Sequence, residues 1–271
     1  LPVPPLPEAD CTAEAPRLTI SVARLEQLSP ALLELGCPAR VYIPLEEVSR
    51  LESLPGEGPE WCAVLSRVWR DRDEPALRTL LERARALGFT GVLIGNLGHL
   101  PLVRGLNFHL YGDYGLNVFN SRSLAYLKDK ELESACVSFE LRFAQIRDLK
   151  KVLRAEAIVY GRLPLMITEN CIIHNHSGRH TCANVNLLTD RKGERFPVVK
   201  APGCRNEILN SKKLFLADKA GDWQRLGLWA GRLMFTTENA RECVQVLERY
   251  LGRGSYQPND YTRGLYYRGV E

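Results

Sequence analysis

The sequence contains no apolar run long enough to cross a membrane. A transmembrane helix needs about 20 consecutive apolar residues, and no run in the chain approaches that length. The first residues also lack the basic and apolar regions of a secretory signal peptide. We therefore expect a cytoplasmic protein without membrane spans. The net charge of +4 is small, and it permits nucleic acid as a partner without indicating it.

Cysteine is too sparse for a disulfide scaffold, because only eight occur in 271 residues. Cytosolic thiols stay reduced, and clusters of them there indicate metal binding. Cys37, Cys62 and Cys136 stand in apolar or strand-like surroundings. We expect these three to be packed thiols.

Several catalytic signatures are also missing. The sequence has no GxSxG, HExxH, GxxxxGK[ST] or GxGxxG motif. The sequence therefore gives no support for a serine hydrolase, a zincin, a P-loop protein or a dinucleotide-binding protein of the usual kind. A nucleophilic pair of Cys171 with His174 or His176 stays open, because spatial proximity cannot be read from sequence.

The composition is that of an ordinary globular domain, with 45% hydrophobic and 25% charged residues. The chain starts with a proline-rich stretch, LPVPPLP, and has no initial methionine. Such a stretch is typical of an interdomain linker. We predict a linker over residues 1–16 and a single domain over residues 17–271.

Short runs rich in Val, Ile, Leu and aromatic residues have the composition of buried parallel strands. The eight runs are residues 18–23, 40–44, 61–69, 91–96, 107–111, 135–140, 156–160 and 231–235. Helical patterns occur at residues 25–35, 74–87, 143–153 and 238–250. This alternation predicts an α/β fold, a (β/α)8 TIM-like barrel. Irregular connections at residues 98–105 and 117–127 indicate that the barrel is distorted.

An insertion at about residues 161–230 separates the seventh and eighth predicted strands. It contains a hairpin-like turn at residues 190–193 and a strand-like run at residues 213–217. A loop that follows a barrel strand lies at the carboxyl-terminal mouth, where active sites of this fold are found. We therefore expect the insertion to lie beside the active site.

The insertion also gathers metal-ligand side chains. They are Cys171, Cys182, Cys204, His174, His176 and His180. Cys243, at the start of the last predicted helix, is a candidate fourth thiolate. Four thiolates suit a [4Fe–4S] cluster or structural zinc, and a mixed thiolate and imidazole site suits zinc. The alternative is that the cysteines pack in loops and the histidines are exposed.

Polar residues at the ends of predicted strands form a second candidate set. They are Arg70, Asp71, Asn96, His99, Tyr111, Asp113, Asn117, Asn120, Glu140, Arg142, Tyr160 and Arg162. A ring of polar side chains at a barrel mouth is what substrate binding requires. Strand ends also adjoin loops, where polar residues occur without any function.

Several segments together resemble the U32 peptidase family, the collagenase-like peptidases. They are GDYGLNVFNS (112–121), VSFEL (137–141), EAIVYGRLPLMITENC (156–171), LTDRKGERFPV (188–198), CRNEILNSKKLFLAD (204–218) and DYTRGLYYRGVE (260–271). The spacing YGR-PLM-x4-C is the most specific of these patterns. The resemblance covers roughly residues 90–271.

The resemblance implies a barrel enzyme. The family is named for protease activity, and its better-understood relatives are oxygen-independent hydroxylases with a four-cysteine [4Fe–4S] cluster. Those relatives act on transfer RNA, ribosomal RNA or a quinone precursor. By this resemblance the metal ligands are Cys171, Cys182, Cys204 and Cys243. We further expect Glu140, Arg162 and Tyr160 to be catalytic and Asn117, Asn120, Asp113 and Arg205 to bind substrate.

Two other functions stay open. A metallopeptidase would need a metal with an open position and a general base such as Glu140 or Glu169. A barrel that only binds substrate would use metal for folding. The proline-rich start also fits the C-terminal barrel of a longer two-barrel member, with the N-terminal barrel as its partner. RNA or a peptide would then be the substrate.

Overall fold

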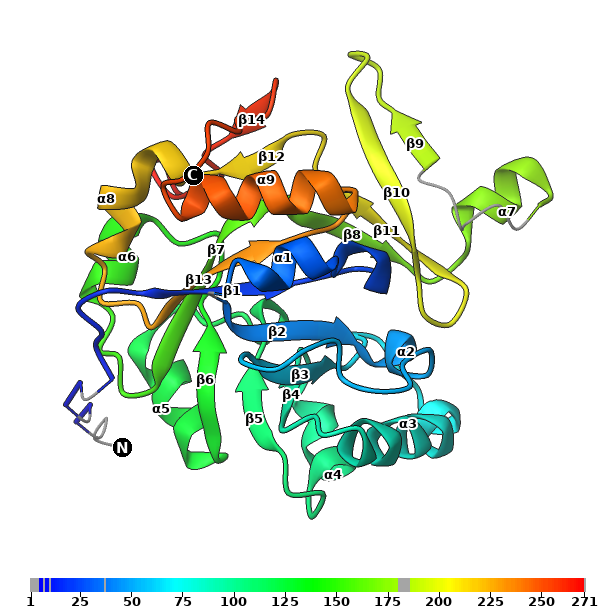
Figure 1. The fold of residues 1–271 in the computed structure, drawn as a ribbon, viewed down its shortest axis with the longest axis horizontal. Helices are drawn as coiled ribbons and strands as arrows, with labels where there is room; N and C mark the ends of the chain where they lie inside the picture. Colours follow the sequence, from blue (N-terminus) through cyan, green and yellow to red (C-terminus); the bar gives the residue numbers. More distant parts are fainter. Residues whose placement is uncertain (1–4, 7, 10, 37, 180–185, 271) are drawn as a thin grey trace.

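The barrel wall consists of parallel strands. The structure is a computed structural model that describes residues 5–270 except 7, 10, 37 and 180–185. In this part of the chain, eight parallel strands follow one another around the wall, and β7 pairs with β13 to close it (Figure 1). They are β1 (Arg17–Ser21), β2 (Pro38–Pro44), β3 (Glu60–Val64), β4 (Gly91–Ile94), β5 (His109–Gly112), β6 (Leu132–Cys136), β7 (Arg154–Gly161) and β13 (Ala230–Met234). The prediction of a TIM-like barrel is confirmed.

The strands alternate between two environments. Side chains point in turn to opposite faces of a strand. In β2, Val41 and Ile43 belong to the large apolar core outside the wall, whereas Arg40 and Tyr42 lie in the barrel interior. The outer face thus supplies apolar packing area, and the inner face carries polar groups.

Helices cover the outside of the wall. The α-helices of the described residues are α1 (Pro30–Glu34), α2 (Leu45–Val48), α3 (Glu74–Ala86), α4 (Leu100–Val103), α5 (Ser121–Asp129), α6 (Phe143–Asp148), α7 (Ile172–Ser177), α8 (Ala220–Gln224) and α9 (Ala240–Tyr250). Short 3-10 turns are η1 (Leu25–Gln27), η2 (Asp71–Asp73), η3 (Leu97–His99), η4 (Tyr114–Leu116) and η5 (Ala217–Lys219). Helix α3 buries Leu77, Leu81 and Ala84, whose spacing places them on one face.

Two predicted helices and one connection predicted to be irregular need correction. The helix expected at residues 25–35 is divided into η1 and α1, because Ser29 caps a new helix whose first residue is Pro30. The helix expected at residues 143–153 ends at Asp148. The connection expected to be irregular at residues 117–127 contains most of α5, which starts after Asn120.

Two strand predictions also had wrong ends. The strand expected at residues 61–69 ends at Val64, which pairs with Leu93 of the short strand β4. The strand expected at residues 135–140 starts earlier, at Leu132, and ends at Cys136, which pairs with Glu156. Neighbouring strands of the wall set these limits, and they are not visible in one segment alone.

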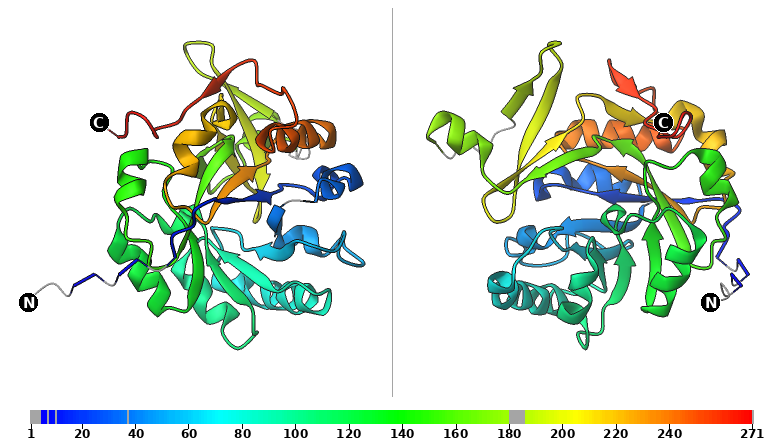
Figure 2. Two further views of the ribbon diagram at one scale, coloured as in Figure 1. Left: turned by 60° about the vertical axis from the view of Figure 1, so that its left-hand side comes forward. Right: turned by 180° about the vertical axis from the view of Figure 1, so that it is seen from behind.

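The insertion between β7 and β13 forms a separate antiparallel sheet. Its strands are β8 (Pro164–Thr168), β11 (Arg205–Leu209), β10 (Arg195–Ala201) and β9 (Asn186–Thr189), in that order. The predicted hairpin is present, and the Asp190 carboxylate accepts hydrogen bonds from the amides of Lys192 and Glu194 at 2.8 and 2.9 Å. The sheet stands beside one end of the barrel, with α7 at its outer side (Figures 1 and 2).

After the inserted sheet, the chain returns to the barrel. Strand β12 (Lys213–Phe215) pairs antiparallel with β7, and β14 (Tyr261–Thr262) joins β12. These two strands fix the last part of the chain next to the end of β7. Among the described residues, no helix combines the length and apolar character needed to span a bilayer.

Candidate functional site

Charged side chains fill the barrel interior. Arg232 of β13 donates from Nε to Oε2 of Glu156 on β7 at 2.9 Å, and from Nη1 to Oδ1 of Asp113 at 2.6 Å. The side chains of Arg232 and Glu156 are only 1% and 2% exposed. A buried charge needs a partner, because its loss of hydration is otherwise uncompensated. Asp113 follows β5, so this network reaches the carboxyl-terminal end of the strands.

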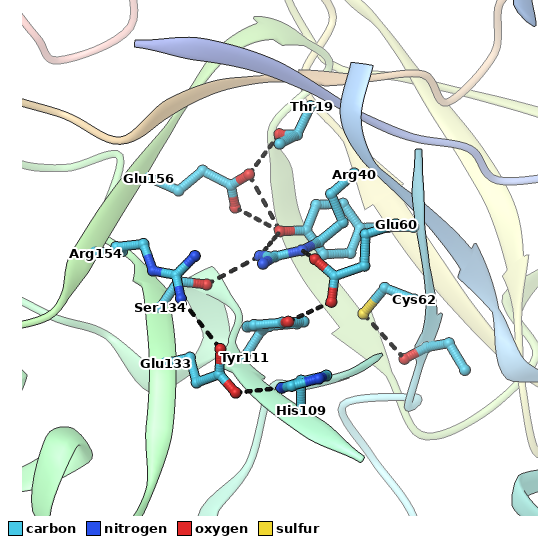
Figure 3. Close-up of polar contacts among 12 residues, drawn as sticks. Thr19, Arg40, Glu60, Cys62, His109, Tyr111, Glu133, Ser134, Arg154 and Glu156 are labelled. Carbon is cyan, nitrogen blue, oxygen red and sulfur yellow. Dashed lines mark hydrogen bonds and ion pairs between the residues drawn. The ribbon is translucent and has the colours of Figure 1, made fainter. Parts of the chain in front are cut away.

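The network continues toward the other end of the barrel (Figure 3). The hydroxyls of Thr19 and Tyr42 donate to Glu156. Arg40 donates to the hydroxyl of Tyr42 at 3.1 Å, to Ser134 Oγ at 3.0 Å and to Glu60 at 2.7 Å. Side-chain hydrogen bonds therefore run from the middle of the barrel interior to the end where the strands begin, the amino-terminal end.

Aromatic rings close the amino-terminal end of the barrel. The guanidinium of Arg40 lies 3.3 Å from the ring centroid of Tyr111 and 4.6 Å from that of Trp229. Below it, Glu133 pairs with Arg154 at 3.1 Å and also with His109 (Figure 3). Stacked side chains fill this end of the barrel, so we expect a ligand site at the mouth near Asp113.

A cleft of about 450 Å³ opens at this mouth. Its lining comes from the β3–α3 connection, η4, the β6–α6 loop, the start of β8 and the last residues of the chain. The lining residues are Arg67, Tyr114, Gly115, Asn117, Ser138, Phe139, Glu140, Leu163, Pro164, Leu165, Asn210, Thr262, Gly264, Leu265 and Arg268. Two of the predicted site residues, Glu140 and Asn117, are among them. The backbone of Asn117 is in the left-handed conformation, with φ of 55°.

The inserted sheet covers part of the mouth with one face. Glu207 of β11 pairs with Val199 and Ile167, so these three residues share that face. Ile208 lies on the opposite face, which packs against α7. Burial raises the pKa of Glu207, with Arg67 and Asp113 as the nearby charges. Glu207 is therefore directed at the barrel mouth.

The other predicted substrate-binding residues lie elsewhere. The Asp113 carboxylate faces inward in its ion pair with Arg232. The Asn120 side chain caps α5 by accepting a hydrogen bond from the amide of Ser123 at 2.9 Å, and it lines a different hollow, together with Tyr126. Arg205 is almost fully buried and bonds Glu169.

Glu169 connects the inserted sheet to the barrel. Arg205 donates to its two carboxylate oxygens at 2.9 and 3.0 Å, and Arg70 from the rim of the barrel donates to the same group. These hydrogen bonds, first from Arg205 and then from Arg70, lower the pKa of Glu169 to about 2. A carboxylate held in this way is a weak general base, so the candidate base that remains in the cleft is Glu140.

Tyr160 and Arg162 lie outside the lining of the cleft. Tyr160 is fully buried, and its hydroxyl donates to Glu238 at 3.2 Å. Arg162 donates to the backbone carbonyl of Asn210 at 2.9 Å and to that of Ser211. Because Asn210 lines the cleft, Arg162 supports its wall from behind.

The structure places the segments that carry two of the four predicted thiol ligands at one end of the inserted sheet. Cys171 is the N-cap of α7, and Cys204 is exposed in the turn between β10 and β11. The pairing of Thr168 with Asn206 places these segments at one end of the β8–β11 ladder, and the Asn206 side chain accepts a hydrogen bond from the amide of Ile173. Cys182 and His180 lie outside the described residues.

Cys243 is in a different place. Its side chain is 0% exposed in the core between α9 and the barrel wall, whereas Cys171 packs in a separate cluster on the inserted sheet. Burial raises the pKa of the Cys243 thiol. Among the residues described, no group of three or more His, Cys, Asp or Glu side chains has an arrangement that could hold a metal ion.

Comparison with known families gives the relationship of the chain. The model of peptidase family U32 matches residues 51–186, which is half of the chain. This chain belongs to peptidase family U32. The match includes β3 to β8 and both Glu140 and Cys171. A search of curated proteins gave no significant match.

Solved structures similar to this U32 chain include two enzymes. The U32 peptidase Mk0906 aligns with a TM-score of 0.49 at 9% identity, over 86% of this chain and 98% of its own. The spore cortex-lytic enzyme SleL of Bacillus megaterium QM B1551 aligns with a TM-score of 0.39 at 10% identity, over 92% of this chain and 76% of its own. The family assignment rests on the sequence match.

Sequence reasoning missed several residues of this U32 site. Glu156 and Arg232 lie within strands that are otherwise apolar, and a charge in such a strand signals a buried partner. We did not predict Arg67 as a site residue, because the strand expected at residues 61–69 included it, whereas β3 ends at Val64. Glu207 had no local signal, because only the docking of the inserted sheet brings it to the mouth.

Proposed function

We propose that this U32 chain is an iron–sulfur enzyme of the hydroxylase type whose substrate binds in the cleft at the barrel mouth. The observation that supports the metal part is that the segments carrying Cys171 and Cys204 lie at the same end of the β8–β11 ladder. Two thiols are donors of the kind that an iron–sulfur cluster requires. In this proposal Cys182 is the third ligand. Reduced thiols would be kept available by a cytoplasmic location.

Cys243 does not fit the ligand set. Its thiol is enclosed by apolar side chains in the barrel core, and its helix packs against η1 and α1 rather than against the inserted sheet. A ligand must be deprotonated, and burial of this thiol opposes deprotonation. The fourth ligand is therefore a donor other than Cys243.

The cluster, when bound, would supply redox chemistry. The cleft residues have separate tasks. Glu140 would accept or return a proton of the substrate, since its carboxylate lines the cleft. Asn117, in its left-handed conformation, would orient a polar group of the substrate. Arg232 holds Asp113 below the cleft, so the floor of the site keeps its position.

The test is metal and sulfide content after anaerobic purification. About four irons and four sulfides per chain are expected in the wild type. Cys171→Ala should lose them, and Cys243→Ala should keep them. The matched control is thermal unfolding of both variants, which shows whether loss of metal reflects loss of fold. Zinc or no metal in the wild type would reject the hydroxylase proposal.

A metallopeptidase is the second candidate, supported by the position of Glu140 in the cleft. Its test is hydrolysis of an unstructured peptide by the metal-loaded chain. Activity that disappears in Glu140→Gln and persists in Glu169→Gln would favour the peptidase. No hydrolysis by the wild type would reject it. A stable barrel that binds substrate with neither activity would be a binding domain.

A further inference from the structure

Two arginines, Arg67 and Arg268, line the cleft. In the part of the chain that the structure describes, neither Arg67 nor Arg268 takes part in a hydrogen bond or an ion pair with another residue. Other arginines near the mouth are paired, as Arg205 is with Glu169 and Arg232 with Asp113. A guanidinium that lines a cleft without a hydrogen bond or ion pair from the protein is available for an anionic ligand.

Packing, rather than an ion pair, fixes the Arg67 side chain. Its stem lies against Gly95 and Gly115, where a Cβ atom would approach the Arg67 side chain to 3.1 and 2.7 Å. Its guanidinium carbon lies 5.5 Å from the ring centroid of Tyr114. The side chain is thus ordered before a ligand arrives, which reduces the entropy lost on binding.

Flat apolar surfaces lie beside this charge. The rings of Tyr114 and Phe139 line the cleft with their centroids 5.7 Å apart and their planes tilted by 49°. Leu163 and Leu165 add aliphatic surface from the start of β8. A ring that enters the cleft can stack on Phe139 while an attached acidic group meets Arg67.

The charges in the cleft favour an anion. Its lining contains Arg67 and Arg268 against one carboxylate, Glu140. Two further acidic groups lie near, of which Asp113 is held in an ion pair with Arg232, which also pairs with Glu156. The other, Glu207, is half-buried, and its removal from solvent raises the pKa of the carboxyl. The lining itself therefore carries one more positive than negative charge.

We propose that the cleft binds an aromatic ring that carries a carboxylate or phosphate, with the acidic group on Arg67 and the ring against Phe139. The volume of about 450 Å³ suits a ligand of this size. This inference rests on the proposed function, since it names the class of substrate that the same cleft would take. Binding requires no metal, so it can be tested even if the iron–sulfur proposal fails.

The experiment is isothermal titration of the full chain with matched probes. Adenosine 5′-monophosphate is compared with adenosine, and benzoate with benzyl alcohol. At least one anion should bind about tenfold more tightly than its neutral partner. Tighter binding of the nucleotide identifies a phosphate as the acidic group, and tighter binding of benzoate identifies a carboxylate.

Variants decide whether Arg67 is the binding group. Arg67→Gln should remove the preference for the anion, and Arg268→Gln, at an exposed position, should weaken it without affecting the fold. Arg104→Gln is the matched control, because Arg104 is exposed and lies outside the cleft lining. Equal affinity for charged and neutral probes, unchanged binding in Arg67→Gln, or no binding of any probe would overturn the proposal.

Discussion

The guanidinium of Arg232 donates two hydrogen bonds to the carboxylate of Glu156 in the middle of the barrel. Both side chains are almost completely removed from solvent. The eighth strand is thereby bonded to the seventh through its side chain as well as through its backbone. This pair stands where most barrels have packed aliphatic residues.

Arg232→Met should destabilise the fold strongly. It would leave Glu156 and Asp113 as buried carboxylates without their partner, at a cost of about 3–5 kcal/mol. The measurement is the free energy of unfolding in urea. Arg147→Met is the control, because its exposed pair with Asp148 should contribute little to stability. Equal effects of the two changes would contradict the role of the buried pair.

Glu169→Gln should loosen the inserted sheet from the barrel. The neutral amide cannot bind Arg205 and Arg70 as the carboxylate does. Hydrogen exchange at the amides of β8 and β11 should become faster, while exchange in β1 and β2 stays the same. Glu74→Gln, which breaks an ion pair within α3, is the control that should leave the sheet protected.

Acid should release the same contact. Hydrogen bonds from Arg205 and Arg70 lower the pKa of Glu169 in the fold to about 2, below its ordinary value of 4.5. The contribution is complete above pH 4.5 and is lost as the pH falls toward 2. Protection of β8 in the wild type should decrease over this interval, and Glu169→Gln should not show this decrease. A decrease of equal size in the variant would count against the assignment.

His99 should make the protein less stable in mild acid. Its side chain is fully buried beside Trp69, and burial lowers its pKa from 6.5 to about 4. Between these pH values His99 binds a proton in the unfolded chain but not in the folded chain. The free energy of unfolding therefore falls as the pH drops from 6.5 to 4. The loss is on the order of 3 kcal/mol. Urea unfolding of His99→Leu at pH 7 and pH 4.5 should lack this component.

Gly115→Ala should disturb the cleft. A Cβ atom there would lie 2.6 Å from the carbonyl oxygen of Gly95 and 2.7 Å from Cδ of Arg67. Arg67 must then move, and the preference of the cleft for an anionic probe should decrease. Gly221→Ala is the matched control, because a Cβ in α8 meets no atom within 4 Å. It should raise stability by about 0.4–1 kcal/mol and leave binding unchanged.

Periodicity and composition were sufficient for the barrel and for the place of its insertion. The apolar runs of the wall are strong local signals, as in β4, where all residues are buried. Strand ends were less accurate because they depend on the neighbouring strand, as the early end of β3 at Val64 illustrates. The hairpin at Asp190 was predictable because its turn is stabilised locally.

The site was only partly predictable. Glu140 and Asn117 were found because they follow strands directly, and both line the cleft. Tyr160 also ends a strand, but it turns outward into a buried cluster with Tyr256 and Glu238. Glu207 reaches the mouth through the packing of a distant sheet, and no pattern around it in the sequence indicates that position.

Closure of the barrel depends on its last strand. In the finished wall β13 pairs with β1 on one side and with β7 on the other, and Arg17 lies opposite Ala230. During synthesis, the seven earlier strands are complete well before residue 230 leaves the ribosome. Strands β1 and β7 then each have an unpaired edge until β13 is made. Unpaired edges of this kind pair with other chains. The rate at which the barrel closes in the cell should therefore depend on the synthesis of β13. A chain truncated before β13 should aggregate.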